Sequence, residues 1–350
     1  MISDIKIKDI SIGESHSPFI IAEMSGNHNQ SLDRALEIIK AASKSGAHAV
    51  KIQTYTADTM TLDIKENEFF IEDKDSLWNG KSLYELYEIA YTPWEWHKQI
   101  FERCDQLGLL CFSSPFDATA LSFLEKLNCP CYKIGSTENT DFELLKKVAG
   151  TGKPVIISTG MATVEELGQI VSVVQKAGCT DLILLKCTAA YPATPSDANL
   201  TTIKHMKDLL GCQIGLSDHT LGIGVAVASI ALGATMIEKH FTISRKDNGV
   251  DAAFSMEPHE FKLMVEETKT AWESIGRVSY GPTDSENSEL SRRSLYIVED
   301  MQKGEVVTKN NMRSIRPGYG LPVKYFNDIL GMKVTADIRR GTRVSWKLLK

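Results

Sequence analysis

The stretch that decides the fold is LSDHTLGIGVAVASIALGATMIEKHF, residues 216–241. Two short apolar runs, 214–216 and 236–237, lead into His219 and His240, and one helix's length of small residues separates them. The order strand, helix, strand is that of a βαβ unit, whose two strands run parallel. If the strands are neighbours, both histidine rings point into one pocket at the carboxyl ends of the strands.

Two imidazoles at equivalent strand ends indicate a metal site, because a neutral imidazole is the commonest protein ligand for divalent metals. Each histidine also lies close to a carboxylate, Asp218 beside His219 and Glu238 beside Lys239 and His240. The alternative is two unrelated histidines, one capping a turn and one packed in the core. The matched positions favour the metal site.

The pattern of a strand followed by a helix recurs along the first 275 residues or so. Eight apolar runs predict strands: 19–23, 49–55, 108–115, 131–136, 154–160, 181–188, 213–219 and 234–241. Helical spacing of apolar residues predicts the segments between and after them: 31–45, 93–107, 118–127, 142–149, 164–177, 200–210, 223–231 and 258–275. Eight such units match a closed (β/α)8 TIM barrel. An open doubly wound sheet is the alternative, but no Gly-x-Gly-x-x-Gly turn follows the first strand.

The domain organisation follows from the composition of the remaining segments. We expect a barrel over residues 1–277, opened by a short charged lead-in, a polar linker over 278–290, and a small strand-rich domain over 291–350. Fewer than about 60 residues bury only a marginal core, so the small domain is expected to lean on the barrel of its own or another subunit. A long polar excursion, 56–91, interrupts the barrel pattern. It is either a substrate lid or a surface decoration.

Charge and cysteine usage exclude several classes of protein. The net charge of −6 offers no basic field for nucleic acid or a membrane surface. The N-terminus lacks the apolar core of a signal peptide, and no run is long enough to span a membrane, so we expect a cytoplasmic protein. The seven cysteines show no paired zinc spacing and are expected to be buried small hydrophobic residues.

The predicted strand ends carry lysines, hydroxyls, carboxylates and the two histidines. Two lysines and four serines suit a cradle for a phosphate or carboxylate: Lys51, Lys133, Ser114, Ser136, Ser158 and Ser217. Lysine supplies the charge and the hydroxyls supply donors. The alternative is that the lysines pair with Glu23, Glu138 and Glu238.

Several segments resemble the sialic acid synthase family, and they cover essentially the whole chain in order. They are IAEMSGNH (21–28), VKIQTY (50–55), FSSPF (112–116), YKIGS (132–136), STGM (158–161), GLSDHT (215–220), EKHF (238–241) and RPGYG (316–320). The last resembles the arginine motif of the family's C-terminal antifreeze-like (SAF) domain.

A second set of segments is most similar to the pseudaminic branch of the family. These are Leu77-Trp78, SLYELYE (82–88), TPWEWH (92–97) and LKCTAAYP (185–192). The sialic and legionaminic branches typically have Asn where Ala189 follows Cys187-Thr188, which puts their sugar contact in doubt here.

The resemblance implies condensation of phosphoenolpyruvate with the open-chain aldehyde of a 2-acetamido sugar, releasing phosphate and giving a nine-carbon 2-keto acid. In the pseudaminic branch the sugar is 2,4-diacetamido-2,4,6-trideoxy-altrose. A divalent ion on His219 and His240 would polarise the aldehyde, and a metal-bound water or Glu23 would assist water addition. Manganese is the family expectation, and the ligands also admit magnesium, cobalt or zinc.

The resemblance further implies sugar contacts from Tyr191, Asp251 and Arg316. Arg316 lies in the small domain, which in the family crosses to the partner subunit, so a domain-swapped homodimer is implied. The alternative for Arg316 is a surface residue in a turn.

Three other functions remain open from the sequence. The product could be sialic or legionaminic acid, the barrel could hold a metal-dependent pyruvate aldolase that releases no phosphate, or the C-terminal domain could make a non-catalytic sugar-binding or ice-binding protein. The lysines and histidines at the strand ends favour catalysis.

Overall fold

The computed structural model of the protein describes residues 2–74, 76–286 and 288–350. The chain divides into two compact units, Met1–Gly276 and Arg277–Lys350. Each has its own hydrophobic core. No helix among these residues combines the length and the apolar composition that crossing a bilayer requires.

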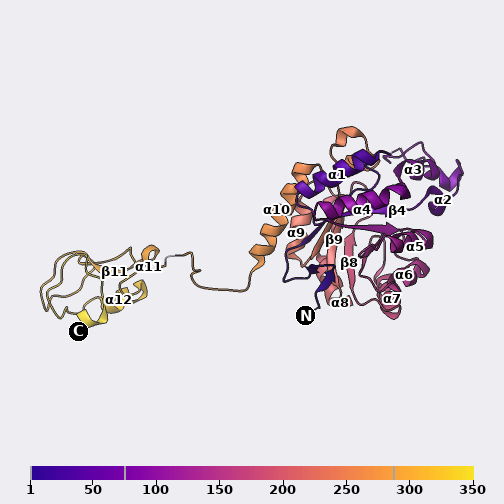
Figure 1. The fold of residues 1–350 in the computed structure, drawn as a ribbon. Coiled ribbons are helices and arrows are strands. Elements are labelled where there is room, and N and C mark those ends of the chain that lie inside the picture. Colours follow the sequence, from indigo (N-terminus) through magenta and orange to yellow (C-terminus); the bar gives the residue numbers. More distant parts are fainter. Residues whose placement is uncertain (1, 75, 287) are drawn as a thin grey trace. The chain divides into compact units, whose positions relative to one another are not determined.

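Eight parallel strands close into a barrel in the first unit, so the predicted fold is confirmed (Figure 1). The strands are β3 (Phe19–Glu23), β4 (Ala49–Thr54), β5 (Leu110–Pro115), β6 (Tyr132–Ile134), β7 (Val155–Ser158), β8 (Leu182–Cys187), β9 (Gln213–Asp218) and β10 (Met236–His240). They are ordered sequentially around the barrel, and β10 closes it by pairing with β3. Every residue of β3 is buried, as expected for a strand covered on both faces.

Helices surround the strands on the outside of the barrel (Figure 1). They are α1 (Leu32–Lys44), α4 (His97–Gln106), α5 (Ala118–Lys126), α6 (Phe142–Ala149), α7 (Val164–Lys176), α8 (Thr201–Leu210), α9 (Gly224–Ala231) and α10 (Pro258–Ile275). Helix α1 shows why they form: the Ser31 hydroxyl accepts from the Arg34 amide, and the buried residues Ile38, Ile39 and Ala42 lie on one face.

The strand register determines which polar residues lie side by side at the carboxyl ends of the strands. His240 pairs with Glu23, and Glu23 pairs with Lys51 on the next strand. Glu238 pairs with Ser217 on the other side of β10. Residues from four consecutive strands of the barrel therefore meet near the carboxyl ends, where TIM barrels carry their chemistry.

Two segments differ from the sequence-based expectation. The lead-in contains an antiparallel hairpin of β1 (Ile5–Ile7) and β2 (Ile10–Ile12), whose inward residues Ile5, Ile7 and Ile12 join the barrel core. The excursion contains α2 (Ala57–Met60) and α3 (Leu83–Ala90), which pack on each other. It is thus a folded element.

The second unit is less regular than its predicted strand-rich description. It pairs β11 (Ser294–Ile297) with β12 (Met312–Ile315), and isolated bridges join most of its remaining extended segments. Two short helices, α11 (Ser288–Ser291) and α12 (Phe326–Ile329), accompany them. Its core contains ten buried apolar side chains, among them Leu295, Met312 and Val344.

Candidate functional site

The two histidines predicted as metal ligands lie together. His219 directly follows β9 and His240 ends β10, with ring centroids 5.3 Å apart and both side chains buried. His219 Nδ1 lies 2.9 Å from the Thr188 carbonyl oxygen. Because a carbonyl only accepts, Nδ1 carries a proton, and Nε2 is the ring nitrogen left for another partner. Burial lowers the pKa of His219, but the contact with Cys187 outweighs it, so the net shift is upward. The two histidines are therefore neighbours in one cavity, and their role as metal ligands stays a prediction.

His240 presents a buried ring nitrogen without a partner. Among the described residues no hydrogen bond reaches its Nδ1, and the nearest carboxylate oxygen, Asp251 Oδ2, is 3.8 Å away. Burial, followed by the neighbouring cations, holds the pKa of His240 well below its usual value. The ring is therefore neutral, which is the form that binds metals.

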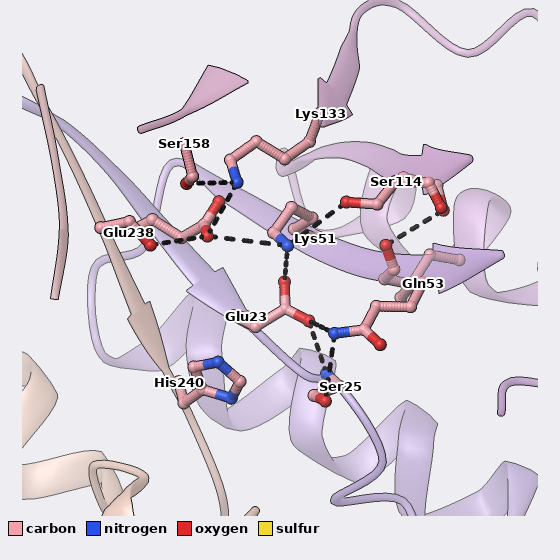
Figure 2. Close-up of polar contacts among 12 residues, drawn as sticks. Glu23, Ser25, Lys51, Gln53, Ser114, Lys133, Ser158, Glu238 and His240 are labelled. Atoms are coloured by element: carbon pink, nitrogen blue, oxygen red, sulfur yellow. Dashed lines mark hydrogen bonds and ion pairs between the residues drawn. The ribbon is translucent and has the colours of Figure 1, made fainter. Parts of the chain in front are cut away.

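Two lysines and two glutamates form a buried ion-pair cluster beside His240 (Figure 2). Lys51 Nζ lies 2.6 Å from Glu23 Oε2 and 3.6 Å from Glu238 Oε1, and Lys133 Nζ lies 3.5 Å from the same Glu238 oxygen. The structure thus agrees with the alternative that these lysines pair with Glu23 and Glu238, since buried ammonium groups are stable when paired with carboxylates. Glu138 forms no ion pair with them among the described residues.

The four predicted serines line the same cavity, each at a strand end or just beyond it. Ser114 Oγ accepts from Lys51 Nζ at 3.5 Å and Ser158 Oγ accepts from Lys133 Nζ at 2.7 Å. Ser217 Oγ donates to Glu238 at 3.2 Å, and Ser136 Oγ accepts from the Gly160 amide. The structure therefore brings the proposed cradle together, with its lysines already engaged.

The pKa values of the two glutamates shift in opposite directions. Burial raises the pKa of Glu23, although Lys51 opposes the shift. The pKa of Glu238 is lowered, because Lys133 and Lys51 together outweigh its burial. Glu238 is therefore the fixed anion of the cluster, while Glu23 is the carboxylate better suited to exchanging a proton.

The cavity enclosed by these groups has a volume of about 330 Å³. Tyr191 and Asp251 also line it, as the resemblance implied. The Tyr191 ring lies 4.4 Å from that of His219, and Asp251 accepts a hydrogen bond from Ser25 Oγ. Arg316 belongs to the second unit, where its side chain is exposed.

A second hollow, of about 900 Å³, lies between the β1–β2 hairpin and the helices α8, α9 and α10. It reaches Gly233 and Ala234, which precede β10, so it lies toward the amino ends of the strands. Amino ends of TIM-barrel strands contribute stability, so this hollow is not the catalytic site.

The cavity residues that were not predicted as site residues include Ser25, Gln53, Glu138 and Cys187. Gln53 Nε2 donates to Glu23 Oε1 at 3.1 Å, and the Ser25 amide donates to the same oxygen at 3.0 Å. Burial raises the pKa of Glu138, whose Oε2 has no hydrogen-bond partner among the described residues. Gln53 was recognisable from its strand-end position, whereas Glu138 stands two residues past a predicted strand, where a glutamate is unremarkable.

The donor set fits a divalent metal ion held by two imidazoles. His219 Nε2 and His240 Nδ1 are ring nitrogens that take part in no hydrogen bond among the described residues. Within that part of the chain, no three His, Cys, Asp or Glu side chains surround a common point. Such an ion would keep open positions for water and substrate, as catalytic metal sites do.

Comparisons with known proteins identify the family of the chain. The NeuB family model matches residues 38–280 and the SAF domain model matches residues 292–350. A pseudaminic acid synthase from Helicobacter pylori is 44% identical over 330 residues, covering 94% of this chain and 96% of the relative. An N,N'-diacetyllegionaminic acid synthase from Legionella pneumophila is 34% identical, covering 96% and 95%.

Among solved structures, the N-acetylneuraminic acid (sialic acid) synthetase of Leptospira borgpetersenii in complex with citrate superposes with a TM-score of 0.73. It is 32% identical, and the match covers 81% of this chain and 94% of that one. The resemblance found in the sequence is thereby confirmed. The chain belongs to the NeuB family, with a SAF domain after its barrel.

Proposed function

We propose that this protein is a pseudaminic acid synthase, a transferase that forms a carbon–carbon bond. It condenses phosphoenolpyruvate with 2,4-diacetamido-2,4,6-trideoxy-altrose and releases phosphate. One observation carries the proposal: two imidazoles and a lysine–serine cluster share one cavity, in a chain 44% identical to a pseudaminic acid synthase over 94% of its length. The lower identity to the legionaminic acid synthase, 34%, favours the pseudaminic sugar.

Phosphoenolpyruvate is assigned to the lysine side of the cavity. Lys51 and Lys133 bind its carboxylate and phosphate, and Ser114, Ser136, Ser158 and Ser217 donate to the remaining oxygens. Because both lysines contact glutamates in the protein alone, the incoming anion exchanges with those contacts. Glu238 stays ionised and keeps the ammonium groups at the cavity floor.

His219 and His240 would hold the divalent ion, which supplies Lewis-acid polarisation of the sugar aldehyde when bound. Carbon 3 of phosphoenolpyruvate forms the new bond to the aldehyde carbon, and the aldehyde oxygen takes up one proton to become a hydroxyl. Water adds at carbon 2 and gives up one proton; the bond between carbon 2 and the phosphate oxygen then breaks, and the second water proton leaves as carbon 2 becomes the keto group. Glu23 accepts the first water proton. Its raised pKa and its contacts with Lys51, Gln53 and the Ser25 amide suit a positioned base.

Tyr191, Asp251 and Arg316 are assigned to the sugar. Asp251 is held by Ser25 and suits a sugar hydroxyl, while Arg316 suits an acetamido carbonyl. Arg316 acts from the SAF domain, in a homodimer whose domains are exchanged between subunits. We assign the barrel to residues 1–277, the linker to 278–290 and the SAF domain to 291–350. Manganese as the ion and the cytoplasm as the compartment stay predictions.

The experiment incubates the purified protein and Mn²⁺ with phosphoenolpyruvate and one sugar at a time, then measures released phosphate and the mass of the product. The sugars are the diacetamido trideoxy-altrose, its legionaminic counterpart and N-acetylmannosamine. We expect stoichiometric phosphate and a nine-carbon acid with the first sugar. Faster turnover of either other sugar would reassign the product. Condensation of the sugar with pyruvate, without release of phosphate, would identify an aldolase.

A further inference from the structure

The cavity is lined by polar side chains at the strand ends and by mostly apolar side chains from the excursion. The strand ends contribute charged and hydroxylic side chains, as described above. The excursion between β4 and β5 contributes five lining residues: Met60, Trp78, Leu86, Tyr87 and Ala90. We call these five residues the excursion wall. Only Trp78 and Tyr87 among them carry a polar side-chain atom.

Trp78 uses its polar atom within the protein. Its Nε1 donates to the Val250 carbonyl oxygen at 3.1 Å, which joins the excursion to the loop after β10. Its ring lies 6.2 Å from the Tyr191 ring, and Val250 also lines the cavity. Trp78 therefore offers the cavity an apolar ring, held in place from both sides.

The two excursion helices hold the rest of the wall. Leu86 and Ala90 are four residues apart on α3, so they lie on the same face, and Met60 ends α2, which packs on α3. Tyr87 packs edge-on against Tyr55, which in turn packs against the cavity residue Phe116. The excursion wall is thus continuous with the aromatic residues that follow the barrel strands.

We propose that the excursion is the specificity element of the cavity and selects an acetamido sugar with methyl groups where common hexosamines have hydroxyls. This inference rests on the proposed function. The physical reason is that a sugar hydroxyl enclosed against Met60, Trp78, Leu86 or Ala90 loses its water and gains no side-chain partner, because the only polar atom of these four that could donate, Trp78 Nε1, is hydrogen-bonded to Val250. A methyl group in the same position loses nothing and buries apolar surface.

The preference is best measured on two sugars that differ by one oxygen atom, N-acetylmannosamine and its 6-deoxy analogue. Phosphate release gives kcat/KM for each sugar at saturating phosphoenolpyruvate. We expect the wild-type protein to favour the 6-deoxy sugar by about tenfold or more, the size of effect that one unpaired polar group produces. The proposed function is read separately, from whether any acetamido sugar releases phosphate at all.

Two variants add an amide to the excursion wall, Met60→Gln at nearly constant volume and Trp78→Gln. Leu62→Gln is the matched control, because Leu62 lies two residues from Met60, is 59% exposed and does not line the cavity. Circular dichroism and the KM for phosphoenolpyruvate confirm that each variant folds and binds its donor. We expect at least one wall variant to reduce the 6-deoxy preference about tenfold, while the control keeps the wild-type ratio.

The outcomes separate cleanly. A wild-type protein that uses both sugars equally, or wall variants with the ratio of the control, would overturn the assignment of the excursion even though phosphate is released. Absence of phosphate release with every acetamido sugar would instead refute the proposed function itself.

Discussion

Lys239 lies between Glu238 and His240 in sequence but faces away from the cavity. Its side chain is 1% exposed, and its Nζ donates to Asp218 Oδ2 at 2.6 Å and to the carbonyl oxygens of Thr220 and Gly222 at 2.5 and 3.2 Å. Asp218 in turn accepts from the amide and hydroxyl of Thr220. The two residues that flank His219 are therefore fixed to the strand that carries His240.

Replacing Lys239 tests this role at the scale of one residue. Lys239→Met leaves the Asp218 carboxylate buried without its counter-ion, so we predict a loss of about 3–5 kcal/mol in unfolding free energy. We also expect weaker Mn²⁺ activation, since the loop carrying His219 is released. Urea unfolding and a metal titration of activity measure the two effects.

The controls separate charge from packing. Asp218→Asn combined with Lys239→Met should recover part of the lost stability, because no unpaired charge remains. Lys246→Met, at an exposed position after the same strand, should change neither quantity. Wild-type stability and metal activation in Lys239→Met would show that the buried pair is dispensable.

Single residues also show what the sequence predicts well. His219, His240, Lys51 and Lys133 were recognised because a polar residue that ends an apolar strand has few structural reasons to be there. Pairing of the lysines with glutamates was one alternative, but the sequence could not choose the partners, because the contact between Lys133 and Glu238 depends on the positions of two non-adjacent strands. Glu138 was considered only as a possible partner of the lysines, because its position in the cavity likewise depends on how distant strands are arranged.

At the scale of elements, the excursion was described from its composition as polar, and its helices were missed. The signal was present, since Ser82 and Glu85 form a capping box at the start of α3. Its contact with the cavity was not readable, because it depends on the Trp78 bond to Val250, 172 residues away. The barrel strands, in contrast, were predicted within a few residues, since uninterrupted apolar runs bounded by helices allow little else.

Two buried histidines form hydrogen bonds that attach the end of the excursion to the barrel. His28 Nε2 lies 3.2 Å from Thr92 Oγ1, and His97 Nε2 lies 2.7 Å from Thr54 Oγ1 while its Nδ1 lies 3.2 Å from the Pro93 carbonyl oxygen. Burial lowers the pKa of each histidine to about 4. Both are therefore neutral in the folded protein across the physiological range.

This predicts a loss of stability in mild acid. Above pH 6.5 the folded and unfolded states are both neutral at these positions. Between pH 6.5 and about 4 only the unfolded chain binds the protons, so the folded state loses stability as the pH falls through this window. Lowering the pH from 7.5 to 5.5 should cost about 1 kcal/mol for each histidine.

Urea unfolding at the two pH values, followed through the barrel, measures the effect. His28→Gln combined with His97→Gln removes the titrating groups, so its pH dependence should be smaller than that of the wild type by about 2–3 kcal/mol. His205→Gln, at an exposed position on α8, is the control. An equal pH dependence in the double variant and the wild type would assign the acid sensitivity to other groups.

At the scale of the whole molecule, the net charge of −6 conceals two units of opposite sign. Residues 277–350 carry 14 Lys and Arg against 8 Asp and Glu, while residues 1–276 carry 25 against 37. The statement that nothing in the chain supplies a basic field is therefore wrong for the second unit. Each unit therefore has its own electrostatic field, basic for residues 277–350 and acidic for residues 1–276, which salt screens.

The sequence predicted the larger unit better than the smaller one for a physical reason. The barrel repeats one strand-and-helix unit eight times, so each repeat supports the assignment of the others. In the second unit, the described residues form a core cluster of ten buried apolar side chains, two strands and isolated bridges. Its apolar residues therefore do not recur at a regular spacing along the sequence. The proposed place of Arg316 at the sugar depends on the assembly, which no local pattern encodes.

The central claim is that His219 and His240 hold one divalent ion beside the lysine–glutamate cluster. Electron paramagnetic resonance during a Mn²⁺ titration counts bound ions directly, and circular dichroism verifies the fold of each variant. We predict one bound Mn²⁺ per wild-type chain, and none at the same concentrations in His219→Ala or His240→Ala with the fold intact. Wild-type Mn²⁺ binding in either folded variant would contradict the claim.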